Sequence, residues 1–256
     1  FDLTIDRSVV NYTGKSKIAT LINGSLPAPV LHFKEGETVT INVTNNLKEW
    51  SSIHWHGLLL PFAMDGVPGI SFEGIAPGET FTYQFPILQS GTYWYHSHSG
   101  FQEQTGMLGA IVIEPRDGET IKADCDHVVM LSDWTDENPM VLLNKLKSES
   151  DFDNYQMPTA MRFISDVRKN GWKDTVENRK MWSQMRMNPT DFTDLSAHTY
   201  TYLMNGTNPA SNWTGLFNKG DKVRLRFINA SAQTIFDVRI PGLKLTVIGT
   251  DGQLVD

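Results

Sequence analysis

The sequence is poor in cysteine, in clustered positive charge and in long apolar runs. Its 256 residues contain one cysteine, Cys125, so no disulfide bond can form within the chain. Lys and Arg number 22 against 29 Asp and Glu, and no run of basic residues is present, which argues against a nucleic-acid partner. No apolar stretch approaches the ~20 residues that a membrane-spanning helix needs. The chain starts at "FDLTID" without a basic and apolar leader, so we expect any signal peptide to have been removed.

Alternating apolar and polar residues mark most of the first 115 residues. In "ETVTINVTN" (37–45) and "ETFTYQF" (79–85) every second side chain is apolar, which is the period of a strand with one buried face. The segment "MLGAIVIEP" (107–115) is an almost continuous apolar run. Turn residues separate these segments, so the pattern predicts an antiparallel β-sandwich or barrel.

The residues from about 139 to 192 have a different character. Apolar side chains recur there at helical spacing, and "DTVENRKMWSQMRMNP" opens with a capping box from Asp174 to Glu177. We predict a helical, methionine-containing insertion at 139–192, with surface charges of both signs. The predicted helices lie within 138–149, 158–171 and 174–189.

Beyond the insertion the β pattern returns and repeats the beginning of the chain. The segment "NGSLPAPVLHFKEGETVTINVTN" (23–45) parallels "NGTNPASNWTGLFNKGDKVRLRFIN" (205–229). Likewise "MDG" (64–66) parallels "TDG" (250–252). The sequence therefore predicts two copies of one β domain. The predicted boundaries are 1–116 and 117–256.

The second copy differs from the first in two ways. Where the first copy has His54 and His56, the aligned positions of the second hold Asp237 and Arg239. The second copy also stops soon after its "TDG", whereas the first continues through two or three further strands. A sandwich without those strands would have open edges. We therefore expect the chain to be the amino-terminal part of a longer protein, or to pair with another chain.

Four of the seven histidines form two His-x-His pairs. The stretch "IHWHG" holds His54 and His56, and "YWYHSHS" holds His96 and His98. Residues two apart on a β-strand point to the same face, ~6.7 Å apart at their Cα atoms. Two such pairs on strands that face one another would gather four imidazoles on inward faces. This donor set suits copper, zinc, iron or nickel.

Two other interpretations compete with a shared metal cluster. The four side chains could be ordinary histidines with local hydrogen bonds, although two pairs embedded in aromatics favour a common role. A zinc enzyme could use one pair with a third ligand. Such an enzyme has no need of the second pair, and "HWHGLLL" offers no following acidic ligand.

These motifs carry a resemblance to a known family. The stretches "SIHWHGLLLP", "MDGVPG" and "SGTYWYHSHSGFQEQTGMLGAIVIEP" resemble the first domain of the multicopper oxidases, which include laccases, ascorbate oxidase and bacterial copper-resistance oxidases. The stretches "MWSQMRMNPTD" and "YTYLMNG" are similar to the copper-resistance branch. The resemblance covers essentially the whole chain. It implies an all-β fold of tandem cupredoxin-like Greek-key sandwich domains, the second incomplete, and a trinuclear copper centre that reduces dioxygen to water.

The resemblance also implies roles for single residues. By position, His54 would bind the type-two copper, His56 and His96 one type-three copper, and His98 the other. Asp65, in "MDG", would have a catalytic role in delivering protons near the cluster. The alternative for Asp65 is a plain turn residue before a glycine, since Asp favours turns.

The other copper ligands that the resemblance implies are absent from this chain. They are four more histidines at the trinuclear centre and a blue copper site with one cysteine and two histidines. Cys125 in "DCDH" lacks the flanking sequence of that blue site, so we interpret it as structural. The predicted partner is the carboxy-terminal half of the same enzyme or a complementary chain.

The resemblance implies a periplasmic oxidoreductase with a role in copper resistance. It would couple one-electron oxidation of cuprous ion or a phenol to reduction of dioxygen, and this chain alone would be inactive without the blue site. A non-catalytic periplasmic copper-binding module is the alternative. Methionines of the insertion, such as Met181 and Met185, could also bind cuprous copper, but their helical spacing favours packing.

Overall fold

The computed structural model describes residues 1–148, 159–185 and 200–255. The chain divides into two compact units, one formed by Phe1–Asp136 with Thr201–Asp256 and the other by Glu137–Tyr200. Strands build the first unit and helices the second. Among the described residues, no helix combines the length and the apolar character needed to cross a membrane. The predicted boundary between residues 116 and 117 stays a prediction.

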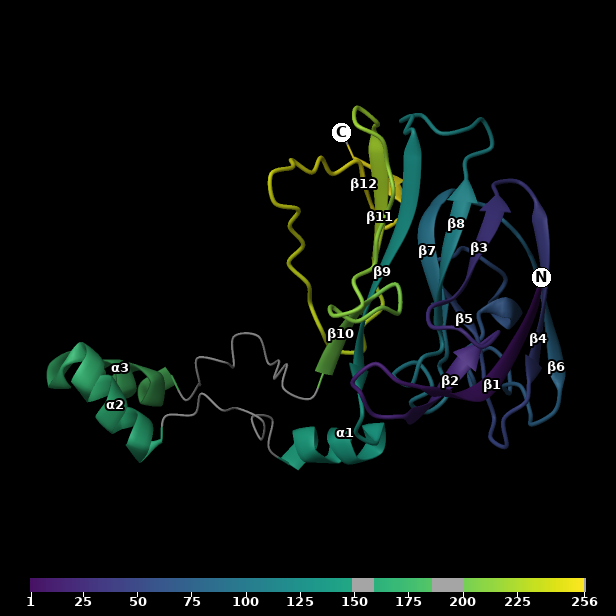
Figure 1. Ribbon diagram of the computed structural model, residues 1–256. Helices are drawn as coiled ribbons and strands as arrows, with labels where there is room; N and C mark the ends of the chain where they lie inside the picture. Colours follow the sequence, from purple (N-terminus) through teal and green to yellow (C-terminus); the bar gives the residue numbers. More distant parts are fainter. Residues whose placement is uncertain (149–158, 186–199, 256) are drawn as a thin grey trace. The chain divides into compact units, whose positions relative to one another are not determined.

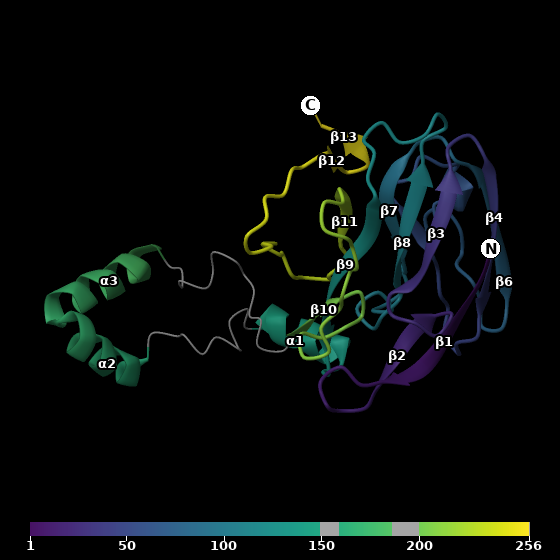
Figure 2. The same ribbon diagram turned by 45° about the horizontal axis from the view of Figure 1, so that its top comes forward.

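Two four-stranded sheets form a sandwich in the amino-terminal part of the first unit, as both views show (Figure 1, Figure 2). The first sheet contains, in spatial order, β2 (Lys17–Ile22), β1 (Asp2–Val10), β4 (Thr38–Asn45) and β6 (Thr80–Pro86). The second contains β3 (Ala28–Lys34), β8 (Leu108–Glu114), β7 (Gly91–His96) and β5 (His54–His56). The strand β5 is therefore short and lies at a sheet edge.

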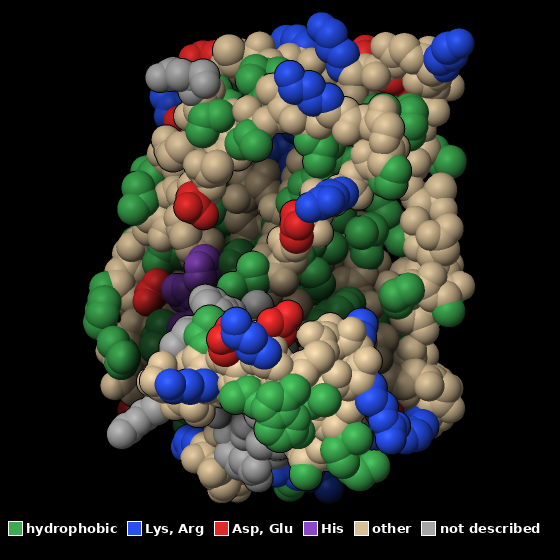
Figure 3. Space-filling view, turned by 90° about the vertical axis from the view of Figure 1, so that its left-hand side faces the viewer, with side chains coloured by type: hydrophobic (Ala, Val, Ile, Leu, Met, Phe, Trp, Pro, Cys, Tyr) green, Lys and Arg blue, Asp and Glu red, His purple; other side chains and the backbone are tan. Residues whose placement is uncertain are grey.

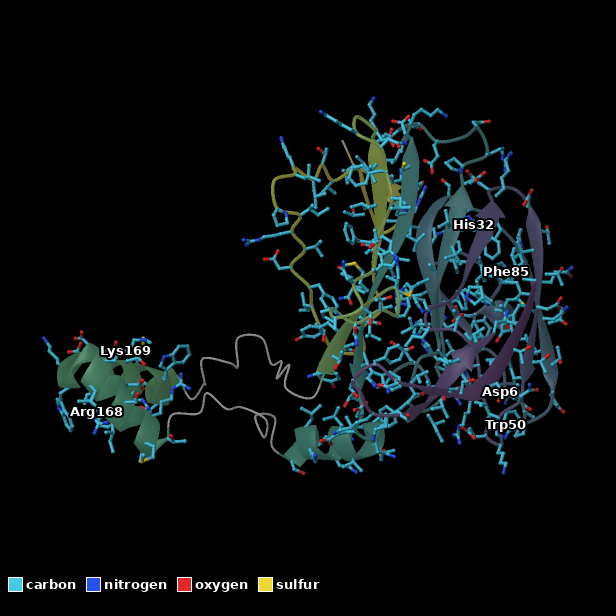
Figure 4. The ribbon with its side chains drawn as sticks, in the orientation of Figure 1. Asp6, His32, Trp50, Phe85, Arg168 and Lys169 are labelled. Atoms are coloured by element: carbon cyan, nitrogen blue, oxygen red, sulfur yellow. The ribbon has the colours of Figure 1, made fainter. Side chains whose placement is uncertain are left out.

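The main core lies between these two sheets. Ile41, Trp55, Tyr83 and Tyr95 are fully buried in it, and Phe85 lies between the two layers (Figure 4). Along β4, buried residues alternate with more exposed ones, as the period of two predicts. The predicted all-β sandwich is confirmed. The prediction that it is antiparallel is wrong, because β1 pairs with β4 and β3 pairs with β8 in parallel.

A third sheet lies against the outer face of the second one. It contains β10 (Tyr200–Met204), β9 (Cys125–Thr135) and β11 (Val223–Asn229) in that order. Leu108 and Ala110 of β8 share a second apolar cluster with Met130 of β9 and Ile228 of β11. The strand β8 is thus buried on both faces, which explains why its sequence is a continuous apolar run. A final hairpin joins β12 (Gly249–Thr250) to β13 (Gln253–Leu254).

The internal repeat is visible in the backbone as a pair of asparagine clasps. Asn23 accepts a hydrogen bond from the amide of Thr4 and donates one to the carbonyl of Asp2. Asn205 accepts from the amide of Met130 and donates to the carbonyl of Val128, at the same two-residue spacing. Both asparagines have positive φ, 51° and 49°. The two aligned segments therefore make the same local structure, in which an Asn-Gly turn fastens the first strand of its copy.

The clasp gives a first testable prediction. Replacing Asn205 with alanine is expected to lower the free energy of unfolding by about 1–3 kcal/mol more than replacing Asn212, because two backbone groups lose their partner. Asn212 has a similar φ of 54°, and among the described residues its side chain makes no hydrogen bond, so Asn212→Ala carries the backbone strain alone. Urea denaturation of both variants checks this, and equal losses would contradict it.

The helical unit agrees with the predicted insertion. Its helices are α1 (Pro139–Ser148), α2 (Ala160–Asn170) and α3 (Trp172–Met185). Gly171 ends α2 at φ 84°, as the Asn-Gly stop predicts. The predicted capping box at Asp174 is wrong, because α3 begins two residues earlier and Asp174 lies within its first turn. The end of the insertion and two of its methionines, Met157 and Met187, lie outside the described residues.

Candidate metal centre

The strands β5 and β7 place the two histidine pairs side by side. They are antiparallel neighbours in one sheet, with His54 opposite His96 and His56 opposite Trp94. The two strands that carry the pairs are thus lateral neighbours, whereas the sequence analysis expected strands that face one another. Directly opposed residues of paired strands have Cβ atoms ~5 Å apart, so lateral pairing gathers the imidazoles at least as well.

The histidines lie on the face of this sheet that points away from the main core. Their strand neighbours Trp55 and Tyr95 point into the core and are 0% exposed. His96 is buried, His54 is half-buried, and His56 and His98 are exposed. Histidine side chains reach the surface with an acidic side chain beside them (Figure 3). The prediction that all four imidazoles face inward is wrong, because aromatic side chains fill the inner face.

All four rings nevertheless come together. His98 lies beyond the end of β7, yet its ring centroid is 4.5 Å from that of His54 and 4.9 Å from that of His96. His56 and His54 each have their ring centroid 5.5 Å from that of His96. The ring centroids of His54 and His56 are 5.7 Å apart, so His54 and His96 each lie near the three other rings. The predicted cluster therefore exists in the structure.

The nitrogen atoms of the cluster converge as metal ligands do. His56 Nδ1 lies 3.3 Å from His96 Nε2. Two imidazole nitrogens that share one metal at about 2.0 Å are roughly 3 Å apart. One nitrogen from each of His54, His56 and His96 lies within 4.8 Å of the others. An all-imidazole donor set of this kind fits copper, zinc, iron or nickel, and it has no carboxylate or thiolate.

The imidazoles of His54 and His96 are each held by a hydrogen bond from Nδ1 to a residue outside the cluster. His54 Nδ1 donates to the carbonyl oxygen of Asp65 at 2.8 Å. His96 Nδ1 donates to Glu103 Oε2, also at 2.8 Å. Each bond fixes the tautomer in which Nε2 carries a lone pair, which is the form that binds a metal.

Asp65 contacts the cluster through its backbone and its side chain. Its Oδ1 lies 3.5 Å from His54 Nδ1, and its side chain is 36% exposed. It also precedes Gly66, whose φ is 77°. Asp65 is therefore a turn residue, as the alternative interpretation holds. It also places a carboxylate beside a histidine of the cluster.

A buried polar network fixes the loop that carries His98. Gln102 Oε1 accepts hydrogen bonds from Ser51 and Ser97, and Gln102 Nε2 donates to the carbonyl of Trp50. The amide of His98 donates to Ser52 Oγ. The sequence reasoning missed Gln102 and Glu103. The sequence feature that could have identified them is the polar stretch "GFQEQTG" directly after the second His-x-His pair.

Trp94 covers the other side of the cluster. Its ring stacks on that of His96, with centroids 4.0 Å apart and planes 12° apart, and lies 4.9 Å from His56. Trp55, Tyr93 and Tyr95 pack in the main core, whereas Trp94 packs against the second apolar cluster. Trp94 therefore limits the orientation of two imidazoles.

Partial desolvation and neighbouring imidazoles favour the neutral form of His56 and His98, although both side chains are exposed at the surface. The pKa of His56 is lowered by desolvation and then by the proximity of His96 and His54. The pKa of His98 is lowered by desolvation and then by His54 and His96. Neutral imidazole is the form that binds metals, so both side chains stay competent as ligands below the pH at which an ordinary histidine is protonated.

These shifts predict a pH-dependent stability for the metal-free protein. Between the lowered folded pKa values and the ordinary value of 6.5, the unfolded chain binds more protons, so the free energy of unfolding rises with pH. Protonation of these two histidines lowers the free energy of unfolding by its full amount below the folded pKa values, and has no effect at neutral pH, where both are unprotonated in either state. Urea denaturation at about pH 5 and about pH 7 checks this. The double variant His56→Gln/His98→Gln should depend less on pH, and an equal dependence would contradict the prediction.

Cys125 does not take part in the described cluster. It is half-buried on β9, with its Sγ 3.5 Å from Asp221 Oδ2. Desolvation and then the Asp221 carboxylate raise the pKa of its thiol. A thiol held protonated is a poor metal ligand, which favours the structural interpretation of Cys125.

The fold and the site together define a class of protein, a β-sandwich metal protein in which two neighbouring strands, β5 and β7, bring imidazoles together. Models of multicopper oxidase domains match residues 4–118 and 125–256. The chain therefore belongs to the multicopper oxidase family. Copper is the metal of this family, and the all-imidazole donor set fits it.

Individual relatives agree with this assignment. The chain is 59% identical over 256 residues to copper resistance protein A of Escherichia coli and 57% identical to that of Pseudomonas syringae pv. tomato. It spans 42% of the length of each. The blue copper oxidase of Nitrosomonas europaea has a similar structure, with a TM-score of 0.63 and 28% identity, over 90% of this chain and 60% of that one. The laccase of Botrytis aclada gives a TM-score of 0.60 at 29% identity, over 90% of this chain and 37% of that one.

Proposed function

We propose that this chain supplies the histidine cluster of a copper-dependent oxidase that acts in copper resistance. The observation that carries the proposal is the convergence of His56 Nδ1 and His96 Nε2 at 3.3 Å, with His54 and His98 packed against them. Membership of the multicopper oxidase family and the high identity to proteins named copper resistance protein A support it.

In this proposal the four histidines hold three copper ions. His56 and His96, which share the shortest distance between nitrogens, hold one ion together, whereas His54 and His98 each hold another. Copper bound there supplies the one-electron chemistry that delivers electrons to dioxygen. The surroundings of the cluster lower the pKa of His56, which keeps its imidazole neutral. Trp94 stacks on the ring of His96 and helps to direct its lone pair toward the other histidines.

Asp65 is the proposed proton-handling residue. Its carboxylate is partly exposed, so it can exchange protons with solvent, and it lies beside His54. A general acid or base must be within hydrogen-bond reach of the proton that it moves, directly or through one water. An Asp65→Asn variant keeps the turn and the backbone carbonyl that His54 contacts. It should slow oxidase turnover while leaving copper content unchanged.

The reductant and the partner also belong to the proposal. A cuprous ion or a small phenol would give up electrons one at a time, at a blue copper site in a carboxy-terminal part of the same enzyme or in a complementary chain. The periplasm is the proposed location. The relatives' greater length supports a further part of the enzyme, and the name copper resistance protein A supports copper as the reductant.

Oxygen consumption by the longest polypeptide that contains this chain tests the proposal. With copper and a cuprous or phenolic reductant, that polypeptide should consume dioxygen, and a His98→Ala variant should not. A wild-type polypeptide that binds copper without consuming dioxygen would overturn the oxidase. It would favour the alternative, a non-catalytic copper-binding module, for which the exposure of His56 and His98 is the supporting observation.

A further inference from the structure

We propose that Glu103 is a positioning residue that holds His96 in the orientation and tautomer required for copper binding. This inference rests on the proposed function, because it takes His96 to be a copper ligand. The supporting contact is the 2.8 Å hydrogen bond from His96 Nδ1 to Glu103 Oε2. Glu103 itself lies outside both His-x-His pairs.

The hydrogen bond to Glu103 leaves one nitrogen of His96 available. Nδ1 keeps its proton and donates it in the hydrogen bond to the carboxylate, so Nε2 carries the lone pair. Nε2 is the atom that lies 3.3 Å from His56 Nδ1. Trp94 stacks on the ring at 4.0 Å and sets its plane. Glu103 sets the rotation within that plane, so the two contacts together leave His96 one orientation.

The loop that carries Glu103 is itself rigid. The amide of Gly106 donates to the Glu103 carbonyl, and the amide of Thr105 donates to the Phe101 carbonyl. The preceding residue, Gln102, is 7% exposed and is anchored by three side-chain hydrogen bonds. The carboxylate is therefore presented to His96 by a preorganised turn, as a supporting contact of a ligand must be.

A carboxylate at this position does more than a neutral acceptor. His54 uses a backbone carbonyl for the same purpose, at the same distance of 2.8 Å. A carboxylate partner strengthens the hydrogen bond and makes the ligating nitrogen more basic. The side chain of Glu103 is 28% exposed and that of His96 is 7% exposed, so solvent weakens this bond only partly. His96 should accordingly be the strongest donor of the cluster.

The tautomer of His96 can be measured in the metal-free chain. In wild-type protein with ¹⁵N-labelled histidine, the imidazole nitrogens of His96 should report one tautomer, with the proton on Nδ1. In Glu103→Ala they should report a larger share of the Nε2–H tautomer, because only the longer contact to the Ser97 carbonyl, at 3.3 Å, then accepts from Nδ1. Glu103→Gln offers a neutral acceptor of nearly the same shape and should retain the Nδ1–H form.

Copper affinity is the second readout. Competition with a chelator should show Glu103→Ala binding copper about 10–100-fold more weakly than wild type, the range measured for partners of metal-bound histidines. Glu103→Gln should fall between the two. The control is Glu79→Gln, which removes the same charge from an exposed turn at the start of β6 and should bind as wild type does.

The outcomes separate this inference from the proposed function. A Glu103→Ala variant with the wild-type tautomer, or with the wild-type copper affinity, overturns the positioning role. If the wild-type chain does not bind copper, the proposed function fails, and the tautomer measurement alone then decides whether Glu103 orients His96. Should Glu103→Ala fail to fold, the graded change in Glu103→Gln decides the same question.

Discussion

A His96→Ala variant is expected to bind copper on the order of 100-fold more weakly than wild type. Structural zinc sites with four protein ligands have roughly 10–16 kcal/mol of apparent binding free energy, so a single ligand is worth about 3 kcal/mol, and His96 is one of the two ligands that this chain gives its ion. The ring of His96, like that of His54, lies near those of the three other histidines. His96 differs from His54 in that its Nε2 makes the 3.3 Å approach to His56 Nδ1. Chelator competition on purified protein measures the change.

The matched control for His96 is His32. It is an exposed histidine on β3 (Figure 4), and His32→Ala removes one imidazole without touching the cluster. His32→Ala should bind copper as tightly as wild type. If His96→Ala also retained wild-type affinity while remaining folded, the cluster would not be the copper site.

Gly66→Ala is expected to be the most destabilising single substitution near the site. A Cβ at position 66 would lie 1.8 Å from the carbonyl oxygen of Ile53 and 3.2 Å from the amide nitrogen of His54. The φ of 77° adds strain of ~1–2 kcal/mol, and relief of the clash adds ~1–3 kcal/mol. Because the backbone that must move carries His54, the variant should lose copper affinity as well as stability.

Gly69→Ala separates backbone strain from the clash. Its φ is 75°, nearly that of Gly66, but a Cβ there would meet no atom within 4 Å. This variant should therefore lose only the strain energy, about 1–2 kcal/mol, and should keep its copper affinity. Urea denaturation and copper titration of the two variants compare them directly. Equal effects on both would show that the close approach of Gly66 to Ile53 is unimportant.

Much of the sandwich and of the cluster follows from local pattern. The period of two in β4 and β6 defines which side chains are buried, because a strand has only two faces. The two His-x-His pairs identify the cluster without any knowledge of the fold. The family is equally readable, since the motifs around these pairs are long and specific.

The features that the sequence did not predict depend on contacts between distant residues. The pairing of His54 with His96 joins positions 42 apart (96 minus 54), and no local pattern says whether two strands pair laterally or face each other. His98 is placed by Ser52 and by the Gln102 network after its own strand has ended. The start of α3 was misjudged because Gly171 ends α2 and also accepts from Thr175, which leaves no room for a cap at Asp174.

The twin asparagine clasps separate the scaffold of this chain from its chemistry. Both aligned segments hold a strand with the same contacts, made by Asn23 and by Asn205. The positions aligned with His54 and His56 hold Asp237 and Arg239, which form an exposed ion pair. The same local support thus accompanies metal-binding side chains in one place and a charged surface in the other, so substitutions at Asp237 and Arg239 should leave the histidine cluster unchanged.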